Sequence, residues 1–94
     1  MIGKTGTTIE SRIIGNGDTE IVVIYRGTPV VTFNSGVVVL NTGGWYSATT
    51  ARRMNEAAEQ YGLRYKVFRR KGKFYCERLG VQYLFNGDTL VLFR

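Results

Sequence analysis

The sequence predicts a single α+β domain, residues 1–94, in which one central amphipathic helix lies on an antiparallel curved sheet or half-barrel of about seven to eight short strands. Three observations predict this fold. Runs of β-branched residues separated by turn residues fill residues 8–40, residues 51–61 change to a helical spacing, and the strand pattern then returns. A chain of 94 residues that is 44% hydrophobic is large enough for one core.

The first half is predicted to form a meander of four strands, at residues 8–14, 20–26, 29–33 and 37–40. Asn16-Gly17-Asp18 separates the first two strands and Asn34-Ser35-Gly36 separates the last two, and such residues supply the left-handed backbone positions of tight hairpins. Pro29 cannot donate a ladder hydrogen bond, so we expect it at a strand start or at a sheet edge.

One helix follows, because apolar residues recur at helical spacing with charged residues on the opposite face. These apolar positions are Ala51, Met54, Ala57, Ala58 and Tyr61. We expect Thr49 or Thr50 to cap the N-terminus of the helix through its hydroxyl, and Gly62 to end the helix in a left-handed conformation.

The remaining strands are predicted at residues 63–69, 74–78, 81–85 and 89–93. Turns at Lys71-Gly72, Leu79-Gly80 and Asn86-Gly87-Asp88 separate them. Asp18 and Asp88 occupy equivalent places in two similar Asn-Gly-Asp-Thr turns, and we expect both carboxylates to bind turn groups rather than to catalyse.

The composition argues against most familiar enzyme classes. The chain has no His, which removes imidazole bases, the usual nucleophile systems and the common zinc ligand sets. Cys76 has no second thiol to pair with, so we expect a packed free thiol and a reducing cytoplasm. We therefore predict no enzymatic activity, no catalytic residue, no metal and no cofactor. The apolar runs are too short to span a bilayer and no secretory signal begins the chain, so a soluble protein is expected.

The densest set of polar and aromatic residues lies where the fourth strand passes through Gly43-Gly44 into the helix. The first N–H groups of a helix and its dipole favour anions, and glycines allow close approach of a ligand. Hydroxyls and arginines can hold a phosphate, and an aromatic ring can stack on a base. The candidate ligand-binding residues are Trp45, Tyr46, Ser47, Thr49, Thr50, Arg52 and Arg53. The alternative interpretation is structural: the glycines form the corner, a threonine caps, and Trp45 fills space beneath the helix.

The same segment resembles a family of small proteins encoded by tailed bacteriophages. The resemblance rests on Leu40-Asn41-Thr42-Gly43-Gly44-Trp45, the threonine pair and the Arg53-Met54-Asn55 sequence, and it spans about a third of the chain. Many of those proteins have an Arg after the Trp, where this chain has Tyr46, so its ligand or affinity can differ. The resemblance implies a phage accessory protein that acts in the cytoplasm of an infected bacterium, and it implies no particular activity.

The net charge of +6 lies entirely in the second half of the chain. A strip of basic and aromatic residues there is typical of single-stranded nucleic-acid binding. Its members are Arg64, Lys66, Arg69, Arg70, Lys71, Lys73 and Tyr75.

The sequence thus favours a non-enzymatic protein that sequesters a small phosphorylated ligand, such as a nucleotide signalling molecule of host defence. The alternatives are a single-stranded DNA- or RNA-binding module and an inhibitor that docks on an acidic host protein. We also expect a homo-oligomer, because a small β-rich domain exposes sheet edges.

Overall fold

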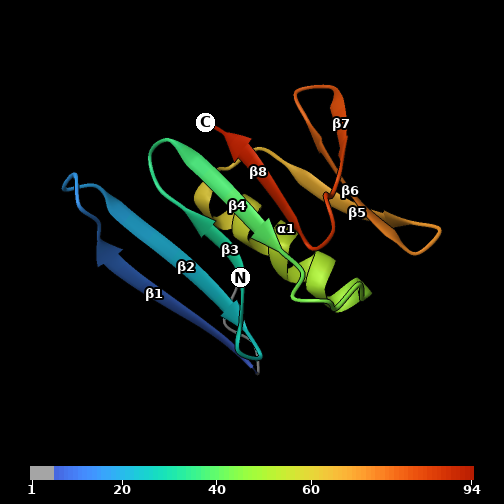
Figure 1. Ribbon diagram of the computed structural model, residues 1–94, viewed down its shortest axis with the longest axis horizontal. Helices are drawn as coiled ribbons and strands as arrows, with labels where there is room; N and C mark the ends of the chain where they lie inside the picture. The colour runs from blue at the N-terminus through green and yellow to red at the C-terminus, as the bar shows by residue number, and fades with distance from the viewer. Residues whose placement is uncertain (1–5) are drawn as a thin grey trace.

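The computed structural model describes residues 6–94, which form eight strands and one helix (Figure 1). In chain order the elements are β1 (Thr7–Ile13), β2 (Thr19–Tyr25), β3 (Thr28–Phe33), β4 (Val37–Asn41), α1 (Ala48–Tyr61), β5 (Lys66–Arg70), β6 (Lys73–Arg78), β7 (Val81–Leu84) and β8 (Thr89–Phe93). The antiparallel α+β fold predicted from the sequence is confirmed. The largest difference is at β5, which begins at Lys66 rather than Leu63, because Arg64 has a positive φ of 61° that interrupts the extended chain.

The strands divide into two antiparallel sheets, and neither sheet closes on itself. One sheet has five strands in the order β1-β2-β3-β4-β8, and the other has three in the order β5-β6-β7. β8 returns to the first sheet after the chain has built the second, and it pairs with β4. Figure 1 shows α1 behind the five-stranded sheet, close to the strands of the smaller sheet. The helix therefore packs between elements of both sheets, chiefly β3 and β5.

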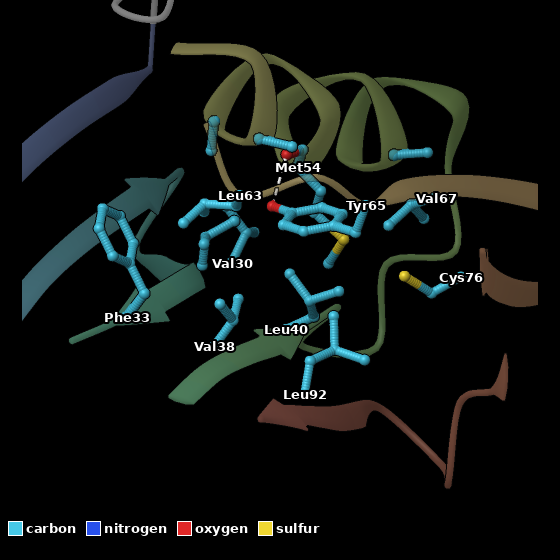
Figure 2. Packing of buried hydrophobic residues seen from close by; sticks show 14 of the residues in the cluster. Val30, Phe33, Val38, Leu40, Met54, Leu63, Tyr65, Val67, Cys76 and Leu92 are labelled. Carbon is cyan, nitrogen blue, oxygen red and sulfur yellow. Dashed lines mark hydrogen bonds between the residues drawn. The ribbon is translucent and has the colours of Figure 1, made fainter. Parts of the chain in front are cut away.

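One hydrophobic core joins the three layers (Figure 2). Leu40 and Val38 point from the five-stranded sheet toward Met54 of the helix, and all three side chains are fully buried. Cys76 enters the core from β6, also fully buried, and burial raises the pKa of its thiol to about 11. The thiol is consequently neutral at physiological pH and lies among apolar side chains.

Asn55 and Tyr65 fasten the helix to the smaller sheet. The Asn55 side chain donates to the carbonyl oxygen of Val67 (2.8 Å) and accepts from its N–H (2.7 Å). Tyr65 donates its hydroxyl to the carbonyl oxygen of Met54 at 2.7 Å, the dashed line in Figure 2. Because β5 is an edge strand, the Asn55 amide takes the place that a neighbouring strand would have there.

The turn between β3 and β4 corrects one prediction. None of residues 34–36 has a positive φ. Instead, the Asn34 side-chain oxygen accepts from the N–H groups of Gly36 (2.8 Å) and Val37 (3.0 Å), which closes the turn without a left-handed residue. The Asp18 carboxylate accepts from the N–H of Ser35 (3.0 Å) and from its hydroxyl (2.5 Å), so it joins this turn to the preceding one. These bonds to Ser35 lower the pKa of Asp18.

Candidate functional site

The corner between β4 and α1 is built by hydrogen bonds within residues 41–45 and by two left-handed glycines. Gly43 and Gly44 have φ of 63° and 87°, a conformation that glycine adopts without strain. Asn41 Oδ1 accepts from the Gly43 N–H (2.9 Å), and Thr42 Oγ1 accepts from the Gly44 N–H (3.1 Å). The corner also packs tightly against β3: a methyl group on Gly43 would lie 2.6 Å from Thr28 Cγ2. The path of the chain into the helix is therefore fixed by hydrogen bonds within the corner and by its packing against β3.

Ser47 caps the helix, so the prediction of a Thr49 or Thr50 cap is wrong. Ser47 has extended backbone angles, and its Oγ accepts from the N–H of Thr50 at 3.2 Å. The hydroxyls of Ser47 and Thr50 also lie 3.0 Å apart. No acidic residue stands in the first turn. The positive end of the helix dipole is consequently not offset by a carboxylate of its own helix.

A cleft of about 300 Å³ opens beside this helix start. Three segments meet around it: the turn between β2 and β3, the corner after β4, and the first turn of α1. Its lining consists of Tyr25, Arg26, Thr28, Val30, Thr42, Trp45, Ser47, Thr49 and Thr50. Four of the seven residues predicted to bind the ligand are in this set, and the structure brings them together with Tyr25 and Arg26 from the turn between β2 and β3.

The positive charge at the cleft comes from Arg26, which the sequence reasoning did not select. The Arg26 and Arg53 guanidinium carbons each lie 5.5 Å from the centre of the Tyr25 ring. Arg53 also pairs with Glu56 at 2.8 Å, which neutralises part of its charge. Arg26 lines the cleft directly. Its only sequence signal was a basic residue before Gly27 in a tight turn, which does not reveal what the turn faces.

Trp45 and Tyr46 are separated by the structure. Trp45 lines the cleft with 67% of its surface exposed. Tyr46 instead donates its hydroxyl to Asp88 Oδ1 (2.5 Å), with the Gly87 carbonyl oxygen 3.0 Å from the same hydroxyl, and its ring meets Phe74 edge-on. The Tyr46 bond is the main cause that lowers the pKa of Asp88, and it raises the pKa of Tyr46. Tyr46 thus lies outside the cleft and anchors the corner to the turn before β8.

Arg52 also lies away from the cleft. It lines a shallow depression on the helix surface together with Arg69, Glu56 and Glu59. Successive helix residues are about 100° apart around the axis, so Arg52 and Arg53 leave the helix in different directions. Of the predicted arginine pair, only Arg53 approaches the cleft, through the Tyr25 ring.

The basic strip predicted for nucleic acid is distributed over several surfaces. Lys66, Arg70, Lys73 and Tyr75 share one face of the smaller sheet, as their cross-strand pairing requires. There Tyr75 stacks on Phe68 at 5.6 Å, and the Arg70 guanidinium lies over both rings.

The other members of the strip lie elsewhere. Arg69 belongs to the opposite face and donates to the Tyr46 carbonyl oxygen at 3.2 Å. Lys71 occupies the hairpin turn with φ 52°, and Arg64 precedes β5.

The part of the chain that the structure describes contains no cluster of three or more His, Cys, Asp or Glu side chains arranged to hold a metal ion. Within residues 6–94, no helix combines the length and the apolar character that crossing a membrane requires.

The comparisons with known proteins give one match. The model of a protein family described as Kyanoviridae Gp96 protein matches residues 3–91, which is nearly the whole chain. No curated protein and no solved structure matches the chain.

Proposed function

The chain belongs to the Kyanoviridae Gp96 family of phage proteins, and from this premise we propose that it is a phage accessory protein that binds a small phosphorylated ligand in the cleft at the start of α1. The observation that carries the proposal is the convergence of three chemistries on one cleft. Arg26 supplies a charge, the helix start supplies hydroxyls and a dipole, and Trp45 supplies an open aromatic face.

Phosphate would bind at the helix start. Thr49 presents its hydroxyl there, whereas the buried Thr50 hydroxyl lies against Ser47 Oγ, and the helix dipole adds the equivalent of about half a positive charge. The Arg26 guanidinium can form charge-assisted hydrogen bonds to phosphate oxygens. The Tyr25 ring packs against that guanidinium and restricts the Arg26 side chain before a ligand binds. The conformational entropy that Arg26 loses on binding is therefore smaller.

The base of a nucleotide would stack on Trp45. An indole that is 67% exposed leaves much apolar surface in water, and covering it favours binding. A cleft of about 300 Å³ is at the small end of ordinary ligand sites, which suits a single nucleotide unit rather than a large cofactor. The proposal includes no reaction: the protein would sequester a nucleotide signal of host defence in the cytoplasm of the infected cell.

The test is titration calorimetry against nucleotides, cyclic dinucleotides and ADP-ribose derivatives, with Trp45 fluorescence as a second signal because it is the only tryptophan. For the ligand that binds, Arg26→Gln should weaken affinity about tenfold, as expected for loss of one charge-assisted bond. Arg52→Gln removes the same charge outside the cleft and should change affinity less than about twofold. Equal effects of the two variants, or no effect of Arg26→Gln, would overturn the proposed site.

A single-stranded DNA- or RNA-binding module is the second candidate, favoured by the basic residues beside Phe68 and Tyr75 on the smaller sheet. The two rings already stack on each other beneath Arg70, which leaves less of their faces for bases. A salt titration separates the two functions. Three to four phosphate contacts on a single strand give a slope of log K against log salt of about −2 to −3, whereas the cleft ligand responds weakly.

A further inference from the structure

A second basic groove lies at the opposite end of the helix from the cleft. Its volume is about 520 Å³, and its walls come from four separate parts of the chain: the turn after β3, the end of α1, the end of β6 and the residue after β8. The residues that line it are Ser35, Gly62, Leu63, Arg64, Arg78 and Arg94. Three arginines that are distant in sequence thus share one small surface.

Two of these arginines are held in place by backbone carbonyl groups. Arg94 Nη1 donates to the carbonyl oxygen of Asn34 at 2.7 Å, and its guanidinium lies over the Phe33 ring at 5.7 Å. Arg78 Nη1 donates to the carbonyl oxygen of Phe93. The Arg78 Nε–H is buried and has no hydrogen-bond partner in the described part of the protein. Both guanidiniums are positioned by neutral carbonyl groups, which do not neutralise their positive charges.

The arginines of the groove lack an acidic partner at ion-pair distance within residues 6–94. The ion pairs found in residues 6–94, Arg12 with Glu20 and Arg53 with Glu56, include none of the three arginines. Asp18 is the acid whose charge reaches Arg94, and its carboxylate is engaged by Ser35. The C-terminal end of the helix contributes about half a negative charge.

We propose that this groove binds a phosphate dianion, either free phosphate or the terminal phosphate of a nucleotide. A dianion is attracted to three guanidinium groups that form no ion pair within residues 6–94, and guanidinium groups bind phosphate oxygens through paired N–H donors. The site is independent of the cleft at the helix start, because a helix of 14 residues is about 21 Å long and one nucleotide cannot span it.

The experiment is a nuclear magnetic resonance titration that follows the Arg Nε–Hε signals and the Trp45 indole N–H signal together. The probes are inorganic phosphate and a nucleoside 5′-monophosphate, with sodium chloride at matched ionic strength. Phosphate should shift the Arg78 and Arg94 signals saturably. Equal affinity for the two probes would show that the groove recognises the phosphate group alone. Tighter binding of the monophosphate would show that the ligand is the terminal phosphate of a nucleotide. The Trp45 signal reports the cleft separately, so either site can fail without the other.

The matched variants are Arg64→Gln and Lys71→Gln. Both positions are exposed and have positive φ (61° and 52°), so the two changes remove one charge from similar backbone. Arg64→Gln should weaken phosphate binding about fivefold to tenfold, and Lys71→Gln less than twofold. The inference is overturned if the shifts are linear, if chloride reproduces them, or if both variants weaken binding equally.

Discussion

Gly43 and Gly44 share a left-handed conformation but differ in their surroundings. Alanine substitutions at the two positions therefore distinguish the cost of backbone strain from the cost of a steric clash. A Cβ at Gly43 would meet Thr28 Cγ2 at 2.6 Å and Oγ1 at 2.8 Å, whereas a Cβ at Gly44 would meet nothing within 4 Å. Gly44→Ala should cost about 1–2 kcal/mol of unfolding free energy through strain alone. Gly43→Ala should cost about 1–3 kcal/mol more, because the corner must move away from β3. Urea unfolding measures both, and equal costs would contradict the packing argument.

Asp88 makes the stability of the corner depend on pH. The hydroxyls of Tyr46 and Thr42 donate to its carboxylate and lower its pKa from the ordinary value of 3.8. A carboxylate whose pKa is lower in the folded state stabilises fully above its unfolded pKa, and this contribution is lost as the pH falls through the folded pKa.

The melting temperature should therefore fall below about pH 4. Asp88→Asn should flatten that fall, whereas Glu59→Gln, on an exposed face of the helix, should preserve it. Thermal melts between pH 2 and pH 7 provide the comparison. An unchanged pH profile in Asp88→Asn would show that the Tyr46 bond does not contribute.

At the scale of elements, the sequence predicted the strands and the helix well because their signals are local. Alternating β-branched residues and Gly-containing turns determine where each strand begins and ends. The division into two sheets depends on which strands pair, and the β4 to β8 pairing joins residues about 50 positions apart. No local pattern reports such a contact.

The candidate site shows the same limit. Trp45, Ser47, Thr49 and Thr50 were found because one turn of helix and its corner are contiguous in sequence. Arg26 was missed because the β2–β3 turn reaches the cleft only through sheet pairing. The divergence of Arg52 and Arg53, by contrast, follows from helix geometry alone and was available from the sequence.

Asn55 holds the helix and the smaller sheet together, and its loss should be costly. Asn55→Ala removes both bonds to Val67, which is almost fully buried, and leaves its N–H and carbonyl without these partners. We expect a loss of about 2–4 kcal/mol in chemical unfolding and faster amide exchange in β5. Glu59→Ala, one turn later on the exposed surface, should change stability by less than about 0.5 kcal/mol. A small effect of Asn55→Ala would mean that packing alone holds β5.

At the scale of the whole molecule, the face of the five-stranded sheet that turns away from α1 carries a mostly apolar row across β2, β3, β4 and β8 and has no covering element in residues 6–94. The register aligns Val22, Thr32, Val39 and Val91 across four strands. Phe93, beside this row, is 76% exposed. The charged residues of this face, Glu10, Arg12 and Glu20, lie on β1 and β2, so two copies of a protein with a net charge of +6 can meet over β4 and β8 without opposing like charges.

We expect a homo-oligomer formed by this face packing on a second copy, consistent with the symmetry that most small assemblies adopt. Analytical ultracentrifugation should detect the dimer, and Val91→Lys should shift it toward monomer by placing like charges at the interface. Ile13→Lys is the matched control, because Ile13 is also an exposed β-branched strand residue but lies on β1, the far edge of the sheet. A wild-type protein that sediments as a monomer at high concentration would refute the expectation.

The single thiol of Cys76 also allows local opening of the molecule to be measured by chemical labelling. It is fully buried, and its pKa of about 11 keeps it in the unreactive neutral form. A thiol reagent can therefore reach it only in molecules whose β5–β6 region has opened. Under conditions where closing is faster than modification, the labelling rate measures the population of that open state without any change to the sequence. The chain contains no other cysteine, so every modified molecule records one such opening.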